Sequence, residues 1–349
     1  MKISTLLTGV AAAACLMAVA STASAQSWAD TTTVSGRMYY DLSDISTKVD
    51  GTKSGANGTG FDIKRFYIGI DHKFTDMFSA NITTDFQYNS TLGATELYIK
   101  KAYLQASFSP QFNVRAGSTD LPWIPYAESI YGYRYVENTL SDKQKVGTSA
   151  DWGLHALGTF GDATTGNTLS YQLSMINGNG YKNPSRAKSM DFEGRVSAVV
   201  GYQWNFAIGG YSGKLGQAAV GVATPQTAKR FNALAAWVGD HGRLGVEYFT
   251  ANDYSAALVK SATPDKADGY SVFGTYRFNH DWSAFGRVDD VKPSKDLSPT
   301  KKDKYYNLGV TYSAFKNVDF SLVAKHDDLT STGHKTTTDE VGLFAQFQY

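Results

Sequence analysis

The sequence predicts an all-β fold, a transmembrane antiparallel up-and-down β-barrel of about 16 strands. The first observation is composition: the 349 residues include 22 Tyr, 19 Phe and 33 Gly but only 8 Pro. Aromatic residues favour strands, and glycines suit the connections between them. The second observation is a recurring two-residue alternation of apolar and polar side chains. The third is an alternation of short and long connections between the predicted strands.

The first 25 residues are interpreted as a secretory signal peptide, which leaves residues 26–349 as one barrel domain. Lys2 gives a positive start, residues 6–20 are apolar, and Ala23-Ser24-Ala25 is a small-x-small cleavage site. The only cysteine, Cys15, lies inside the apolar stretch. The exported chain is therefore expected to lack disulfides and thiolate metal ligands.

Net charge and hydropathy exclude two further classes of protein. Without Lys2 the chain carries 32 basic and 32 acidic residues, so binding to nucleic acid through bulk charge is disfavoured. Beyond the signal, no segment approaches the roughly 18 uninterrupted apolar residues of a membrane helix. Barrel strands remain possible, because only alternate residues of such strands face lipid.

Period-two alternation is clearest in residues 78–88, where apolar residues such as Phe78, Ile82 and Phe86 alternate with polar residues such as Asn81 and Asp85. Such two-faced segments are typical of strands. The predicted strands lie at 33–42, 61–74, 78–88, 96–108, 112–118, 150–160, 168–177, 190–202, 204–212, 229–238, 243–252, 269–278, 282–290, 304–313, 318–327 and 339–349.

The predicted connections are short at one end of the strands and long at the other. This sidedness is typical of an outer-membrane barrel with both termini on the periplasmic side. The long connections are expected at 43–60, 89–95, 119–149, 178–189, 213–228, 253–268, 291–303 and 328–338.

A soluble β-sandwich or propeller would also contain many two-faced strands. In this chain one strand face is apolar and the other carries charges, and a sandwich could not bury the charged face without a large penalty. Aromatic residues such as Phe74, Phe108 and Trp282 gather near the strand ends, where interfacial girdles are expected. The barrel is therefore favoured.

Three short motifs resemble the phosphate-selective (O/P-type) group of bacterial outer-membrane porins. They are Phe61-Asp62-Ile63-Lys64-Arg65-Phe66-Tyr67-Ile68-Gly69, Lys101-Ala102-Tyr103-Leu104 and Asn113-Val114-Arg115-Ala116-Gly117. In that group, rows of lumen-facing Arg and Lys residues carry anions. The residues that match by strand face form a predicted basic wall of Arg37, Arg65, Lys73, Lys101 and Arg115.

The resemblance implies a water-filled channel in the bacterial outer membrane. Small hydrophilic solutes and ions would diffuse through it passively, with an anion or phosphate preference and no cofactor. The relatives imply a homotrimer. Asp41, Asp71 and Asp85 share the same stretch of wall, so the wall departs from a purely basic ladder.

The connection 119–149 resembles the third loop of porins, which folds into the barrel and narrows the pore. Loops of this length are usually functional or disordered, and this one is too aromatic for disorder. The alternative is an external loop that packs on a neighbouring subunit. The candidate constriction residues are Asp120, Trp123, Tyr126, Glu128, Tyr131, Arg134, Glu137 and Asp142.

Charges on this loop are expected to face the basic wall. Selectivity is set by charge rings and by pore diameter at the narrowest point, so acids of the loop opposite bases of the wall would create a transverse field. The alternative is that each charge pairs with its neighbour. Across all the strands the predicted lumen is nearly balanced in charge.

The chain ends in Phe347-Gln348-Tyr349, which resembles the C-terminal assembly signal of outer-membrane barrels. The resemblance implies that the barrel-assembly machinery is a partner. The alternative is that a hydrophobic strand ends in an aromatic residue by chance.

Two other functions compete with a channel. Outer-membrane enzymes such as phospholipases and proteases need Ser, His and acidic residues together, but the six histidines here are scattered, and only His155 is expected to face the lumen. A receptor or adhesion barrel would need a plug or a long displayed loop, and only residues 26–32 precede the first predicted strand.

Overall fold

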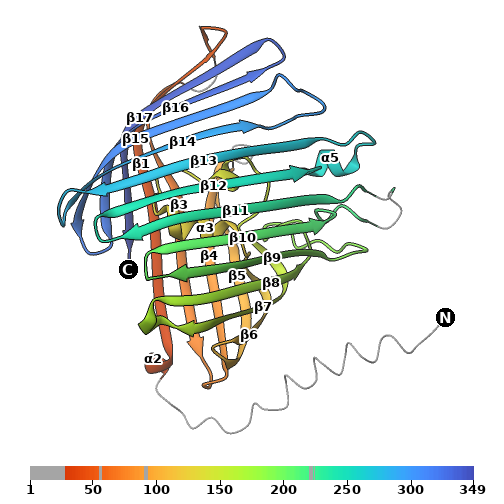
Figure 1. Ribbon diagram of the computed structural model, residues 1–349, viewed down its shortest axis with the longest axis vertical. Coiled ribbons are helices and arrows are strands. Elements are labelled where there is room, and N and C mark those ends of the chain that lie inside the picture. The colour runs from red at the N-terminus through yellow and green to blue at the C-terminus, as the bar shows by residue number, and fades with distance from the viewer. Residues whose placement is uncertain (1–27, 55–56, 90–92, 220–222, 224) are drawn as a thin grey trace.

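The fold is a single closed antiparallel barrel (Figure 1). The computed structural model describes residues 28–54, 57–89, 93–219, 223 and 225–349. The predicted signal peptide, residues 1–25, lies outside the described residues. Among the described residues, no helix is long and apolar enough to cross a membrane.

Sixteen strands form the wall, and a seventeenth short strand, β2 (Thr52–Lys53), pairs with the end of β1. The wall strands are β1 (Thr32–Val49), β3 (Gly58–Lys73), β4 (Phe78–Asn89), β5 (Ala94–Ser109), β6 (Phe112–Asp120), β7 (Ala150–Asp162), β8 (Asn167–Ile176), β9 (Asp191–Val200), β10 (Trp204–Gly213), β11 (Ala228–Gly239), β12 (Gly242–Asn252), β13 (Lys266–Arg277), β14 (Trp282–Lys292), β15 (Lys302–Phe315), β16 (Val318–Ser331) and β17 (His334–Gln348). The short helices are α2 (Trp28–Thr31), α3 (Ile124–Tyr131), α4 (Leu140–Lys143), the 3-10 turn η2 (Ala163–Thr165) and α5 (Ala256–Lys260).

Closure of the wall follows from the pairing of β1 with both β3 and β17. The amide of Gly36 donates to the carbonyl oxygen of Tyr349 at 3.0 Å, and the amide of Tyr349 donates back to Gly36 at 3.1 Å. Each wall strand pairs with a strand on either side, as a bilayer requires, because an unpaired backbone group has no water there. The prediction of sixteen strands is confirmed.

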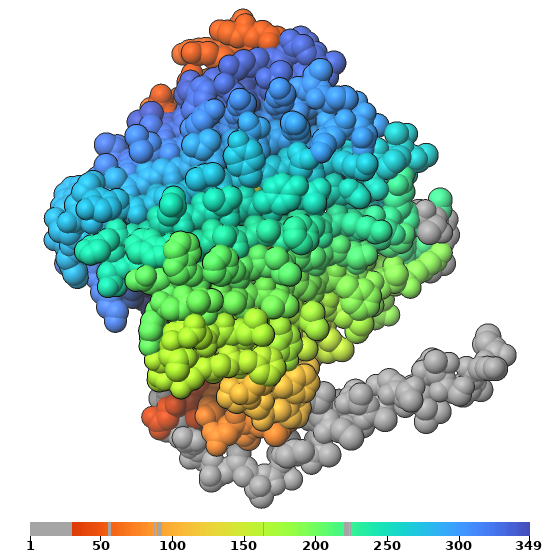
Figure 2. Space-filling model, in the orientation of Figure 1, coloured from red at the N-terminus to blue at the C-terminus, as the bar shows by residue number. Residues whose placement is uncertain are grey.

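The two faces of the strands separate by polarity. In β10 exposed and buried residues alternate along the whole strand, with Trp204, Phe206 and Ile208 exposed on the outside. Leu308 of β15 is 68% exposed. Side chains of β10 to β16 form one continuous outer surface (Figure 2). An apolar outer surface of this extent suits lipid.

Three predicted loops are shorter than expected because the strands continue beyond them. β1 reaches Val49, and β16 and β17 are joined by only Thr332-Gly333, so the predicted loops 43–60 and 328–338 are largely strand. The connection between β4 and β5 is likewise short. Thr332 and Gly333 have φ of 48° and 84°, the backbone of a two-residue hairpin turn. The polar composition predicted a loop, whereas β-branched residues such as Thr336 and Thr338 extend the strand.

The apolar band can be tested with a charge on each face of β4. Ile82 is 51% exposed on the outside, so Ile82→Arg should lower the free energy of unfolding by roughly 2–4 kcal/mol if its site lies near the bilayer midplane. Ser79→Arg, on the inner face of the same strand, should change it much less. Denaturant unfolding in lipid vesicles measures both. Equal losses would contradict the assignment of faces.

Candidate functional site

The connection between β6 and β7 lies inside the barrel and is here called the inner loop, residues 121–149. It begins with α3, which has a proline at its start and ends at Gly132, a left-handed residue with φ of 79°. The short helix α4 follows. Helix α3 lies within the ring of strands (Figure 1), and the side chains of Leu121 and Leu140 are buried.

A buried carboxylate of the wall holds two parts of the inner loop. The Oε1 atom of Glu247, in β12, accepts a hydrogen bond from Trp123 Nε1 at 2.9 Å and from Ser141 Oγ at 3.1 Å. Its Oε2 atom accepts from the amide of Leu140 at 3.2 Å. The beginning of α3 and the beginning of α4 are therefore tied to one point on the wall.

Three arginines of the wall donate to backbone carbonyls of the inner loop. Arg243 Nη1 donates to the carbonyl oxygen of Ile130 at 2.9 Å. Arg287 donates to Asn138 and Arg230 to Val146. Carbonyls outside regular structure need donors when buried, so these arginines replace the partners that a strand would supply.

Tyrosines of the inner loop pack on the same half of the wall. Tyr133 stacks on Phe285 with ring centres 3.9 Å apart, and Tyr131 meets the ring of Phe273 edge-on at 5.3 Å. The hydroxyl of Tyr135 lies 2.6 Å from Ser321 Oγ. The loop is thus packed on one side of the interior.

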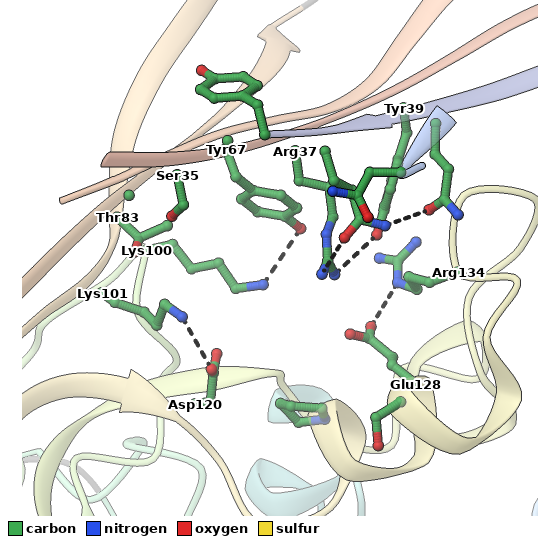
Figure 3. Close-up of a pocket in the computed structure, with 18 of the residues that line it drawn as sticks. Ser35, Arg37, Tyr39, Tyr67, Thr83, Lys100, Lys101, Asp120, Glu128 and Arg134 are labelled. Carbon is green, nitrogen blue, oxygen red and sulfur yellow. Dashed lines mark hydrogen bonds and ion pairs between the residues drawn. The ribbon is translucent and has the colours of Figure 1, made fainter. Parts of the chain in front are cut away.

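The other side of the interior holds a cavity of about 620 Å³ (Figure 3). It lies between the inner loop and the wall formed by β1, β3, β4, β5 and β17. Charged residues of both signs line it, namely Arg37, Lys100, Lys101, Arg134, Asp71, Asp120 and Glu128. Its dimensions and polar lining suit a small hydrated solute.

Two β-bulges bring extra cations to this wall. The pairing of β4 with β5 steps from Thr83↔Lys101 to Thr84↔Ile99, which leaves Lys100 as the inserted residue. Lys64 is inserted in the same way where β3 pairs with β1. A bulge can re-aim a side chain, and Lys100 lines the cavity together with Lys101. Strict alternation from Lys101 excludes Lys100 from the predicted basic wall. One sequence signal does point to the bulge: Lys100 and Lys101 are adjacent, and strict alternation would force one of them onto the lipid face, where a lysine is costly.

Most charges along the cavity are paired. Lys101 Nζ lies 3.2 Å from Asp120, and Arg134 Nε lies 2.6 Å from Glu128 (Figure 3). Lys100 has a different environment: its Nζ lies 3.4 Å from the hydroxyl of Tyr67 and 4.6 Å from the centre of that ring.

Arg37 is the second cation of the cavity with no carboxylate contact. Its guanidinium donates to Gln348 at 3.1 Å and to the hydroxyl of Tyr39 at 3.4 Å. Within the described part of the chain, no carboxylate oxygen lies within 4.0 Å of the charged nitrogens of Arg37 or Lys100. Asp71 offsets part of this positive charge, and it accepts a hydrogen bond from Asn81 at 2.8 Å.

The predicted basic wall is only partly assembled around the cavity. Arg37 and Lys101 line it, whereas Arg65 faces Asp85 at 4.0 Å and Arg115 donates to Gln105 at 2.7 Å. The prediction that Lys73 belongs to the pore-lining wall is wrong. It lies at the rim, 58% exposed and paired with Asp76 at 2.7 Å, because β3 ends there at the short turn.

The eight predicted loop residues divide into two groups. Asp120, Glu128 and Arg134 line the cavity, and Asp142 contacts Arg134 at 3.3 Å. The other four contact the opposite wall instead. Trp123 is bonded to Glu247, Tyr126 lies under Arg195 at 4.1 Å, Tyr131 packs on Phe273, and Glu137 faces Lys325 at 3.7 Å.

Ion pairs neutralise most of the charges on the wall beneath the inner loop. On this side of the interior, the charges of the loop and the wall pair with their neighbours, which is the alternative to a transverse field. The pairs are Arg230 with Glu193 at 2.8 Å, Arg287 with Asp289 at 2.6 Å, Lys325 with Glu340 at 3.1 Å, and Lys143 with Asp327 at 2.7 Å. Among the described residues, Arg195 and Arg243 of the same wall have no such pair: Arg195 lies over the ring of Tyr126, and Arg243 donates to the carbonyl oxygen of Ile130.

Two carboxylates of the inner loop are shifted in opposite directions. Burial raises the pKa of Asp142, although the guanidinium of Arg134 opposes the shift. Burial acts in the same sense on Glu137, but the nearby charges of Lys325 and Arg287 prevail and lower the pKa of Glu137. Glu137 is thus the more firmly ionised of the two.

The histidine expected to face the lumen, His155, lies in β7. His155 is buried, its Nδ1 lies 2.8 Å from Ser174 Oγ, and its Nε2 lies 3.3 Å from the carbonyl oxygen of Gly117. Ser174 is only 3% exposed, so no substrate reaches it. In the same described ranges, no three or more His, Cys, Asp or Glu side chains form a group that could hold a metal ion.

Residues 33–124 match the family of phosphate-selective porin O and P. The match runs from β1 through β6 into α3 and includes the cavity residues Arg37, Lys100, Lys101 and Asp120. The resemblance seen in the sequence motifs is confirmed over this segment. A comparison with curated proteins found no match.

Solved structures match nearly the whole barrel. The outer membrane channel DcaP of Acinetobacter baumannii is 12% identical, with a TM-score of 0.65, over 91% of this chain and 97% of that chain. The chain has the porin barrel fold. The anion-selective porin from Comamonas acidovorans is 11% identical, with a TM-score of 0.62, over 91% of this chain and 99% of that chain. OmpT of Vibrio cholerae, in-vitro folded and in its trimer form, is 13% identical, with a TM-score of 0.56, over 92% of this chain and 100% of that chain.

Removing the Glu247 anchor should loosen the inner loop. In Glu247→Ala, buried donors such as Trp123 Nε1 and the amide of Leu140 lose their acceptor, which costs about 1–3 kcal/mol for each. Single-channel recordings should therefore show larger fluctuations in open-state current.

The matched control is Asp191→Ala. Asp191 is also a buried strand carboxylate, and it accepts from the amide of Lys214 at 2.7 Å, outside the inner loop. It should lose stability without added current noise. Equal noise in both variants would mean that the inner loop does not depend on Glu247.

Proposed function

We propose that the chain is an outer-membrane porin, a water-filled channel through which small hydrophilic solutes and ions diffuse passively. The observation that carries the proposal is the cavity between the inner loop and the wall of β1, β3, β4 and β5, inside a closed barrel with an apolar outer surface. The inner loop occupies one side of the interior and serves as the constriction. This role suits a loop tied to the wall by Glu247 and three arginines.

The same geometry supports a preference for anions. Charges at a constriction set selectivity, and the paired cations Lys101 and Arg134 leave little net field. Arg37 and Lys100 have no carboxylate contact and exceed the offset from Asp71. The match to phosphate-selective porins over residues 33–124 and the fold shared with an anion-selective porin agree with this preference.

Assembly and location belong to the same proposal. Residues 1–25 direct export and are cleaved. The barrel-assembly machinery recognises the terminal strand, in which Phe347 packs on Tyr40 at 5.7 Å and on Phe320 at 5.9 Å. The barrel forms a homotrimer in the outer-membrane bilayer, in keeping with the trimer form of one structural neighbour.

Shortening the inner loop should raise conductance. Replacing residues 124–136 with a short glycine linker removes the side of the constriction formed by Glu128 and Arg134, and the narrowest section contributes most of the resistance. Single-channel conductance in planar bilayers measures the change. Shortening the external connection 293–301 is the control and should leave conductance unchanged. An unchanged value for the inner-loop variant would exclude this loop as the constriction.

A salt gradient across a planar bilayer should give a reversal potential of anion-selective sign. The preference should fade at high salt, because the Debye length shrinks from about 8 Å at 0.15 M to about 3 Å at 1 M. A cation-selective sign at every salt concentration would contradict the proposed preference, and the absence of any conductance would contradict the channel.

A further inference from the structure

We propose that Lys100 is the specificity-determining residue of this channel and that the bulge in β5 exists to present its ammonium to permeating anions. The inference rests on the proposed channel function and names the group that selects within it. Alternation counted back from Lys101 places Lys100 on the lipid face, so Lys100 lies outside the basic wall expected from the sequence.

The first step is backbone geometry. Ile99 is 41% exposed on the outer face, and regular pairing would place Lys101 opposite in direction to Lys100. In the bulge, Thr83 pairs with Lys101 and Thr84 pairs with Ile99, so Lys100 has no partner in β4. The side chains of Lys100 and Lys101 therefore do not alternate between the two faces. Ser118 Oγ donates to the carbonyl oxygen of Lys100 at 2.7 Å, which gives this backbone carbonyl a partner. Lys100 and Lys101 therefore both reach the interior from adjacent positions.

The second step is the state of the ammonium. Lys100 is only 9% exposed, and its Nζ points into the cavity (Figure 3). An ammonium has three donors, and among the described residues the hydrogen-bond partner of Nζ is the hydroxyl of Tyr67 at 3.4 Å. A poorly hydrated ammonium without a carboxylate contact favours any anion that supplies the missing acceptors.

Lys100 differs from the other cations around the cavity. Lys101, Arg134 and Arg65 each face a carboxylate, at 3.2, 2.6 and 4.0 Å, so an anion near them also meets negative charge. Arg37 has no carboxylate contact but is exposed to water, where its field is screened. The field of a charge is stronger in a less polar setting, so Lys100 acts most strongly on a passing anion.

The test measures reversal potentials in a salt gradient for the full-length barrel and three variants. Lys100→Gln should lower the anion-to-cation permeability ratio about 25-fold, because one unit charge about 4 Å from an ion in water favours an anion about fivefold and disfavours a cation about fivefold. Lys100→Arg keeps the charge and should restore most of the ratio. Lys73→Gln is the matched control, because it removes the same charge at the exposed rim beside Asp76, and its ratio should be unchanged.

A deletion of Lys100 tests the bulge itself. Without Lys100, the pair of Thr84 with Ile99 directly follows the pair of Thr83 with Lys101, and β4 and β5 pair without a bulge. The barrel should therefore assemble, and the permeability ratio should fall as in Lys100→Gln. Heat-modifiable migration in gels confirms assembly of each variant. If this deletion does not assemble, the three substitutions alone decide the outcome.

The outcomes distinguish the two proposals. An anion-selective wild type with an equally selective Lys100→Gln variant overturns the role of Lys100 and leaves the channel proposal standing. An equal fall in Lys73→Gln also overturns it, because the effect would then be one of total charge. A wild type without anion preference removes the proposed preference and the role of Lys100 together.

Discussion

Backbone hydrogen bonding between β1 and β17 is the interaction on which the rest of the structure depends. The pairing runs from Arg37 opposite Gln348 to Val49 opposite Thr336, and it joins the two ends of a sheet that would otherwise expose unpaired groups to lipid. In a bilayer, such groups have no water to bond. Closure therefore makes the barrel compatible with the membrane, and it also creates an enclosed interior.

The enclosed interior explains why charged residues hold the inner loop. Non-regular backbone inside the barrel needs donors and acceptors, and the wall supplies them as side chains because its own backbone groups are used in strand pairing. Glu247 accepts from Trp123 and Leu140, while Arg243 donates to Ile130. The wall beneath the loop therefore carries structural charges, and most of them lie next to a counterion or bond to the loop.

The asymmetry of the interior follows from this arrangement. The loop and its ion-paired wall fill one side, and the cavity occupies the other, where β3 and β5 each carry a bulge. A bulge places two neighbouring side chains on the same face of a sheet. Lys100 and Lys101 consequently share the cavity, but only Lys101 has a carboxylate, Asp120, as its contact.

The sequence by itself determined the barrel, the number of its strands and their lipid-facing sides, because a bilayer imposes a two-residue period that local residues must obey. It also indicated that the loop after β6 is unusual and that Arg37 and Lys101 face inward. Only the tertiary structure decided which charges are paired, since partners such as Glu247 and Trp123 are 124 residues apart. It alone revealed the bulge at Lys100, because a bulge depends on the register between two strands.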